Sequence, residues 1–272
     1  MNAISEAGIT EWQSAIGRAE NIQQILELES LRRYALAIGA DPDVERVLPP
    51  LAHWAFFLPA STDGDIGEDG HPRRGGFLPA IPLPRRMFAA ASIAFKAPLE
   101  LGAPASLTSS VAQVTHKSGR SGDLIFVEVD RLLEQAGVVR VSERQSYVYR
   151  GEGGPVPMPE AAANEPEGER WHPAEVNLFR FSAATFNGHR IHYDRAYATG
   201  VEGYPSLVIH GPLTAAKLAG LAMRTGPIKS FSFRAQAPLF LGQSIFLQTG
   251  EADEVCAVRC DGTTGMTAKV TR

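Results

Sequence analysis

The sequence has few cysteines, no long apolar run and no excess of positive charge. Cys256 and Cys260 are its only cysteines. Their spacing in a strand-like segment places them on one face, too far apart to bridge easily, so we expect two buried, reduced thiols. No apolar run reaches the ~18 residues of a membrane helix, so no membrane partner is expected. A net charge of -4 and a pI of about 6.0 give no reason to expect nucleic acid as a partner.

The composition is that of a globular protein with a substantial core. The 272 residues are 44% hydrophobic and 21% charged, enough for one large domain or two of ordinary size. Residues 1–24 are polar and lack the basic start and apolar block of a secretion leader, so we expect a cytoplasmic protein. No glycine-rich dinucleotide motif or phosphate loop occurs, so NAD and ATP are not implied.

The first half begins with helical patterns and continues with strands. Residues 1–30 carry apolar side chains at loosely helical spacing, and a second helix is expected at 31–38, closed by Gly39. The apolar segment 51–58 fits either a strand or a buried helical turn. Residues 59–84, dense in proline, glycine and aspartate, predict a long loop of the kind that forms lids or binding segments. Strands are expected at residues 90–97, 106–116, 124–129 and 138–149.

The second half follows the same order after a linker at residues 151–170, which is rich in proline and glycine. A helix at 178–186 would be apolar on nearly every side and should therefore be buried. Asn187-Gly188 should end it, because both residues tolerate the left-handed conformation. Asp194 is expected to cap a short helix. The remaining helix is expected at residues 213–224, and strands at 230–237, 243–250, 255–260 and 266–271.

A short repeat relates the two halves. Residues 97–102 (APLELG) match residues 237–242 (APLFLG) at five of six positions. The sequence therefore predicts an α+β fold made of two copies of one unit, at residues 1–150 and 171–272, in which a curved sheet wraps an apolar helix. The alternative is two unrelated α+β domains that share a common turn.

A cluster of polar side chains follows the apolar helix of the second half. His189, Arg190, His192 and Asp194 lie within six residues, and a buried helix that ends in titratable groups rarely serves packing alone. Residues 39–43 stand at the matching place in the first half and contain no histidine. We therefore expect the second copy to carry the chemistry and the first to be a degenerate copy that shapes the pocket.

Two segments of the second half resemble the MaoC-like branch of the hotdog-fold hydratases. They are residues 186–198 (FNGHRIHYDRAYA) and 203–215 (GYPSLVIHGPLTA), and the resemblance extends to residues 84–102 of the first half. It is greatest to the group of hydroxyacyl-thioester dehydratases type 2 and mesaconyl-C4-CoA and itaconyl-CoA hydratases, in which two hotdog units are fused. The resemblance implies a double hotdog fold, an acyl-CoA substrate, no cofactor beyond the coenzyme A of that substrate, no metal, and a homodimer.

The resemblance also implies an acid/base site. In the wider family an aspartate five residues before the motif histidine works with it, and the two positions here are Asn187 and His192. Histidine titrates near working pH, so His192 is the expected general base or acid. Asn187 cannot take a proton, although its amide could orient water or fix the imidazole. Whether a second group acts with His192 stays open, with Tyr193, Asp194 and His189 as the neighbours in sequence.

Further candidates would bind the thioester and the rest of the substrate. Gly211-Pro212 begins a helix whose first N–H groups have no intrahelical acceptor, so those of Gly211 and Leu213 are expected to bind the thioester oxygen. The phosphates of coenzyme A and a second carboxylate on the acyl group would both need cations. Substrate-binding candidates, which could equally serve packing or lie at the surface, are His189, Arg190, His210, Arg85, Arg86 and Arg234.

The leading hypothesis is a hydro-lyase that reversibly hydrates itaconyl-CoA or mesaconyl-C4-CoA to citramalyl-CoA in C5-dicarboxylate catabolism. One alternative is a 3-hydroxyacyl-thioester dehydratase of fatty-acid metabolism. Another is a hotdog thioesterase or acyl-thioester binder, although thioesterases usually need a carboxylate where this chain has Asn187. The spacing of His189, His192 and Asp194, perhaps with His210, also permits a metal-dependent enzyme without specifying one.

Overall fold

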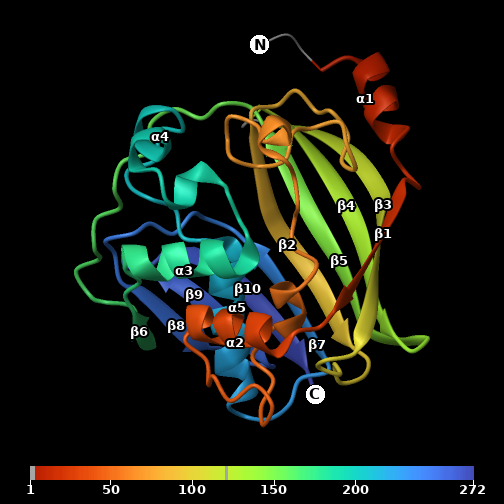
Figure 1. The fold of residues 1–272 in the computed structure, drawn as a ribbon. Helices are drawn as coiled ribbons and strands as arrows, with labels where there is room; N and C mark the ends of the chain where they lie inside the picture. The colour runs from red at the N-terminus through yellow and green to blue at the C-terminus, as the bar shows by residue number, and fades with distance from the viewer. Residues whose placement is uncertain (1–3, 120–121) are drawn as a thin grey trace.

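The computed structural model describes residues 4–119 and 122–272, and in this part of the chain the backbone forms one ten-stranded antiparallel sheet (Figure 1). The strand order is β1-β3-β4-β5-β2-β7-β10-β9-β8-β6. The strands are β1 (Ala19–Ile25), β2 (Arg85–Phe95), β3 (Pro104–Gly119), β4 (Gly122–Gln135), β5 (Val138–Arg150), β6 (Glu169–Trp171), β7 (Ser230–Ala235), β8 (Ile245–Thr249), β9 (Glu254–Arg259) and β10 (Thr264–Thr271).

The strand order repeats about the junction between β2 and β7. Outward from that junction, the first half runs β2-β5-β4-β3-β1 and the second runs β7-β10-β9-β8-β6. The repeated hexapeptide links corresponding strands in each half. Ala97 N–H donates to Arg140 O and Ala237 N–H donates to Gly265 O, both at 3.2 Å. This equivalence is not expected of two unrelated domains, and the predicted double hotdog fold is confirmed.

The central helix distinguishes the two halves. The helices are α1 (Glu6–Gln13), α2 (Leu28–Ile38), α3 (Glu175–Thr185), α4 (Arg195–Gly200) and α5 (Gly211–Met223), with short 3-10 turns η1 (Ala52–Ala55), η2 (Asp63–Asp65) and η3 (Arg190–His192). In the second half α5 is buried against β8, β9 and β10. Among the described residues, the segment of the first half between α2 and β2 holds the short turns η1 and η2 in place of a long helix. The Trp54 ring of η1 packs edge-on against Phe88 and Phe233. None of the helices in the described ranges is long and apolar enough to cross a membrane.

Three expectations about the helices were wrong. Residues 19–25 form the edge strand β1 instead of continuing a helix, because pairing with β3 outweighs the loose helical spacing. The helix α3 is not buried on every side: it packs beside α2 (Figure 1), while Phe179 and Phe186 are 66% and 63% exposed. The left-handed residue that ends α3 is Phe186, with φ 49°, rather than Asn187. The fully embedded helix of the second half is α5.

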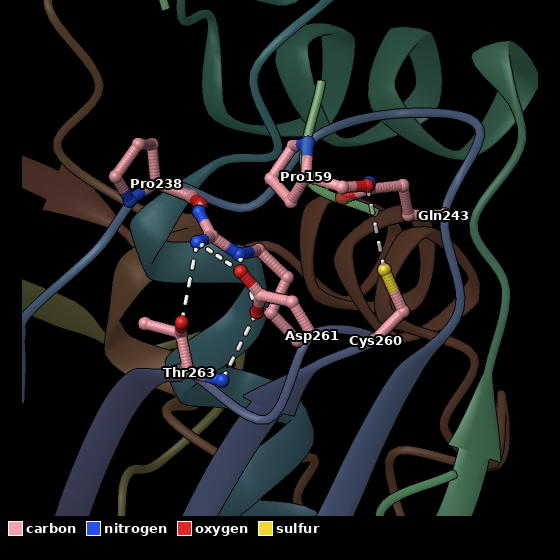
Figure 2. A network of polar contacts seen from close by, with 7 residues as sticks. Pro159, Pro238, Gln243, Cys260, Asp261 and Thr263 are labelled. Atoms are coloured by element: carbon pink, nitrogen blue, oxygen red, sulfur yellow. Dashed lines mark hydrogen bonds and ion pairs between the residues drawn. The ribbon is translucent and has the colours of Figure 1, made fainter. Parts of the chain in front are cut away.

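The linker segment 151–170 packs against the second half and is not a solvent-exposed tether. The Pro159 carbonyl oxygen accepts from Gln243 Nε2 at 2.6 Å and faces Cys260 Sγ at 4.0 Å (Figure 2). The adjacent turn is held by Asp261, whose Oδ1 accepts the Thr263 N–H at 3.0 Å. Cys260, like Cys256, is half-buried, so the expectation of fully buried thiols was wrong. Burial still raises the pKa of both thiols, which disfavours reactive thiolates.

Candidate active site

His192 is a buried, neutral histidine with one ring nitrogen left for chemistry. It ends η3, is 7% exposed, and its Nδ1 lies 2.7 Å from Val208 O. A carbonyl oxygen can only accept, so Nδ1 carries the hydrogen and Nε2 keeps its lone pair. Burial, followed by the nearby His189, lowers the pKa of His192 to about 3. The imidazole is therefore neutral near pH 7 and can accept a proton through Nε2.

His192 belongs to a row of histidine rings drawn from three parts of the chain. Its ring stacks on His210 with centroids 3.7 Å apart and meets His189 edge-on at 5.3 Å. His189 in turn lies 4.3 Å from His71, which comes from the long loop of the first half. Burial lowers the pKa of each of these neighbours below the usual histidine value. The whole row is therefore uncharged at neutral pH.

His210 links the row to the start of α5. It is fully buried, its Nε2 lies 2.9 Å from Ser182 Oγ, and it is the N-cap residue of the helix. Thr214 is the first residue of α5 whose N–H finds a carbonyl, that of His210 at 3.1 Å. Within the described residues, the N–H groups of Gly211 and Leu213 therefore have no acceptor, as expected of a first helical turn. The stacked rings place these groups close to His192.

Asn187 supports the turn, and among the described residues it forms no hydrogen bond with His192. Its Oδ1 accepts the His189 N–H at 3.0 Å, which fixes the bend between α3 and η3. Asp194 has a structural role as well: it caps α4 by accepting the Tyr197 N–H at 3.0 Å and binds Arg190 at 2.7 Å. Both carboxylate oxygens of Asp194 are thereby occupied, which leaves His192 without a carboxylate partner from its own motif.

A loop of the first half completes the site. Arg190 N–H donates to Asp69 O at 2.9 Å, and Gly70 packs directly on Gly188. A Cβ built on Gly70 would lie only 1.9 Å from Gly188 O, so no side chain fits there. This backbone contact positions the next residue, His71, against His189. The proline- and glycine-rich composition of residues 59–84 predicted a binding segment, but nothing in the sequence singled out His71.

The arginines suggested by the sequence occupy different environments. Arg85 is buried, and its Nε lies 2.9 Å from Glu202. Arg190 is held by Asp194 and covers the Tyr197 ring at 4.2 Å. Arg234 is exposed on β7, next to the inward-facing Phe233, so it points away from the histidines. Arg85 and Arg190 are thus paired with carboxylates and Arg234 lies on the outer face, while a role for Arg85 or Arg190 in binding substrate stays a prediction.

Arg86 differs from the other arginines. Its Nη2 lies 3.4 Å from the carbonyl oxygen of Pro72, the residue that follows His71 in the chain. The ring pairs of the row differ in geometry: His192 and His210 are stacked, His189 meets His192 edge-on, and His71 is tilted against His189. Among residues 4–119 and 122–272, no three His, Cys, Asp or Glu side chains are arranged to hold a metal ion.

The depressed histidine pKa values predict that the fold loses stability in acid. The pKa values of His189 and His192 are about 4 and 3 in the folded chain, against about 6.5 when unfolded. Below about pH 6.5 the unfolded chain binds protons that the folded chain excludes. Each group should therefore remove up to about 1.4 kcal/mol per pH unit until its folded pKa is reached.

Urea unfolding at a series of pH values measures this slope. The variant His189→Gln should have a shallower slope between about pH 6 and 4, because one titrating group is gone. The exposed His172→Gln is the control and should match the parent protein. Equal slopes for the parent and the His189 variant would contradict the depressed pKa.

Comparison with known proteins places the chain in a family. The model of the family hydroxyacyl-thioester dehydratase type 2 matches residues 51–241. This chain is 46% identical to a mesaconyl-C(4)-CoA hydratase of Chloroflexus aurantiacus over 239 residues, which cover 85% of each chain. It is 26% identical to the mitochondrial hydroxyacyl-thioester dehydratase type 2 of Schizosaccharomyces pombe, over 73% of this chain and 76% of that one. A MaoC-like dehydratase from Phytophthora capsici shares the fold, with a TM-score of 0.67 over 97% of this chain and 99% of that one at 15% identity. The chain belongs to the hydroxyacyl-thioester dehydratase type 2 family.

Proposed function

We propose that this protein is a hydro-lyase that reversibly adds water to an α,β-unsaturated acyl-CoA, with mesaconyl-C4-CoA as its substrate and citramalyl-CoA as its product. The observation that carries the proposal is the arrangement around His192. The imidazole of His192 is neutral with a free Nε2, and its ring stacks on His210, the residue that directly precedes the unpaired N–H groups of α5. The 46% identity to a mesaconyl-C(4)-CoA hydratase supports the choice of substrate.

The reaction needs a base for water and donors for the thioester oxygen. His192 Nε2 takes a proton from water as the water oxygen bonds to the β-carbon. Electrons move through the double bond to the thioester oxygen, which accepts hydrogen bonds from Gly211 and Leu213. The imidazolium then returns its proton to the α-carbon, so that one water has been added. The developing negative charge on the substrate stabilises the imidazolium, which offsets the low pKa of His192 in the free protein.

Replacement of Asn187 by aspartate tests the place of this residue in the reaction. Asn187→Asp keeps the oxygen that accepts the His189 N–H, so the thermal midpoint should change little. It adds a negative charge beside a row of neutral histidines, which favours their protonated forms. We expect the acidic limb of kcat/KM to move to higher pH, by about one unit or more. Asn187→Ala removes the turn bond and should cost about 1 kcal/mol of stability instead.

The acyl group distinguishes the proposed reaction from its relatives. A 3-hydroxyacyl-thioester dehydratase runs the same chemistry on a monocarboxylic chain, and itaconyl-CoA is an isomeric dicarboxylic substrate. Mass spectrometry of purified protein with mesaconyl-C4-CoA, itaconyl-CoA and crotonyl-CoA separates them. We expect addition of one water to mesaconyl-C4-CoA at the highest kcat/KM. Release of free thiol without hydration would identify a thioesterase, and no product from any of the three would refute the proposal.

A further inference from the structure

Two arginines of the first half bring positive charge to the histidine row. Within the described ranges, neither Arg74 nor Arg86 has a carboxylate oxygen within 4.0 Å, in contrast to Arg85. Arg74 donates to the carbonyl oxygens of Ile81, at 2.8 Å, and Leu83, so its position is fixed. The charge of this corner of the site is therefore not compensated by a direct ion pair.

The carboxylate that acts on Arg74 is that of Asp69, which is hydrogen-bonded to its own loop. Asp69 Oδ1 accepts the His71 N–H at 3.0 Å, which holds the loop in shape. Burial and the neighbouring Arg86 lower the pKa of Arg74, and the more distant Asp69 only partly opposes them. Arg86 Nη2 lies 3.4 Å from Pro72 O, next to His71 in the chain. After burial, the charge of Arg86 is a further cause that lowers the pKa of His189 and His71.

Arg86 faces the same side of the sheet as the start of α5. It pairs in register with Tyr149 on β5, and Phe88 follows it two residues later on the same face of β2. A Cβ built on Gly211 would lie 3.6 Å from Phe88 O, so the first turn of α5 abuts this strand. Arg86 and the helix N–H groups therefore lie at two ends of one short stretch of β2.

Tyr149 adds an unused donor. The residue is fully buried, and burial raises its pKa while the Arg86 guanidinium beside the hydroxyl opposes that shift. Arg86 can only donate, so within the described ranges the hydroxyl hydrogen has no acceptor. An unpaired buried hydroxyl is costly, and such groups are usually explained by a ligand or a water. The Arg74 guanidinium covers the Tyr149 ring at 5.5 Å, so the hydroxyl lies in positive surroundings. A hydroxyl donor beside a guanidinium is a set of groups that suits a carboxylate.

We propose that Arg86, with the Tyr149 hydroxyl, binds the second carboxylate of a dicarboxylic enoyl thioester and so selects such substrates over monocarboxylic chains. This inference rests on the proposed function and names the residues that would set its substrate class. In such a substrate the carboxylate lies beyond the double bond, on the side opposite the thioester. The thioester would lie at the start of α5, His192 at the double bond and the carboxylate at Arg86. The phosphates of coenzyme A are the other anions that Arg86 could bind.

The affinities of two saturated substrate analogues show whether Arg86 binds the acyl carboxylate or the phosphates of coenzyme A. Succinyl-CoA and butyryl-CoA share the coenzyme and differ in the group on the β-carbon, a carboxylate against a methyl. Calorimetric titration should give the parent protein an affinity about 100-fold higher for succinyl-CoA. Arg86→Met should abolish this preference while butyryl-CoA affinity stays within about twofold. Tyr149→Phe should reduce the preference about tenfold.

The controls cover charge and folding. Arg234→Met removes an exposed arginine on the outer face and should leave the preference intact. Arg86→Lys keeps the charge and should retain part of the preference, with an unchanged thermal midpoint. If Arg86→Met lost the same fraction of its affinity for succinyl-CoA and for butyryl-CoA, Arg86 would be assigned to the coenzyme phosphates and the inference would be overturned. A preference that survives in Arg86→Met, or that the parent protein lacks, would also overturn it. Succinyl-CoA preference without hydration of any enoyl-CoA would refute the proposed reaction alone.

Discussion

Replacing His192 by asparagine is expected to lower kcat/KM for mesaconyl-C4-CoA by about a thousandfold, the usual scale of a positioned general base. Asparagine can place an amide N–H near the position of Nδ1, so the bond to Val208 O survives in the variant. The lone pair of Nε2 is lost, and with it the group that takes the proton from water in the proposed reaction. KM should change little, because the imidazole acts in the transition state. Steady-state hydration rates at neutral pH measure the effect.

The matched control is a histidine outside the row. His172 is exposed, so His172→Asn should leave both kinetic constants unchanged. The thermal midpoint of His192→Asn should stay within a few degrees of the parent, because its backbone partner is kept. Normal turnover in a folded His192→Asn variant would show that another group activates the water. In that case His189, or His71 from the first half, would be the next candidate.

Much of the fold could be predicted because its patterns are local. Glycine at position 39 does end α2 in the left-handed conformation, and Asp194 caps α4, since these effects act within one turn. The strand β1 could not be predicted because its pairing partners lie 79 to 91 residues away, from Ile25 with Pro104 to Ala19 with Ser110. The exposure of Phe179 escaped it as well, because α2 covers one side of α3 only.

The site could be predicted only where it is contiguous in sequence. His192, Asn187 and the start of α5 lie in adjacent segments, and the motif marks them together. His71 reaches the row across more than one hundred residues, through a loop whose composition has no regular pattern. The choice between Arg85 and Arg86 also needed coordinates, because neighbouring strand residues face opposite sides and only Arg85 meets Glu202.

Replacing Gly70 by alanine is expected to lower kcat/KM about 100-fold by separating the first-half loop from the motif. Gly70 has φ 84°, and a Cβ there would lie 1.9 Å from Gly188 O, so the two backbones cannot keep their contact. Arg190 N–H would lose its bond to Asp69 O, and His71 would move away from His189. A displacement of about 1 Å in groups that position a substrate can cost this much in rate. Kinetics and the thermal midpoint should be measured together.

Gly75 supplies the control because its backbone is also left-handed, but a Cβ there would not collide with a neighbouring backbone. It lies in the same loop with φ 95°, and its Cβ would make an ordinary contact at 3.4 Å with Ala80. Gly75→Ala and Gly70→Ala both force alanine into a left-handed conformation, at a cost of about 1 to 2 kcal/mol each. The two variants should therefore lose similar stability from strain, while only Gly70→Ala should lose most of its turnover. Equal activity in both variants would mean that the loop of the first half covers the site without taking part in it, and that His192 and α5 suffice for the reaction.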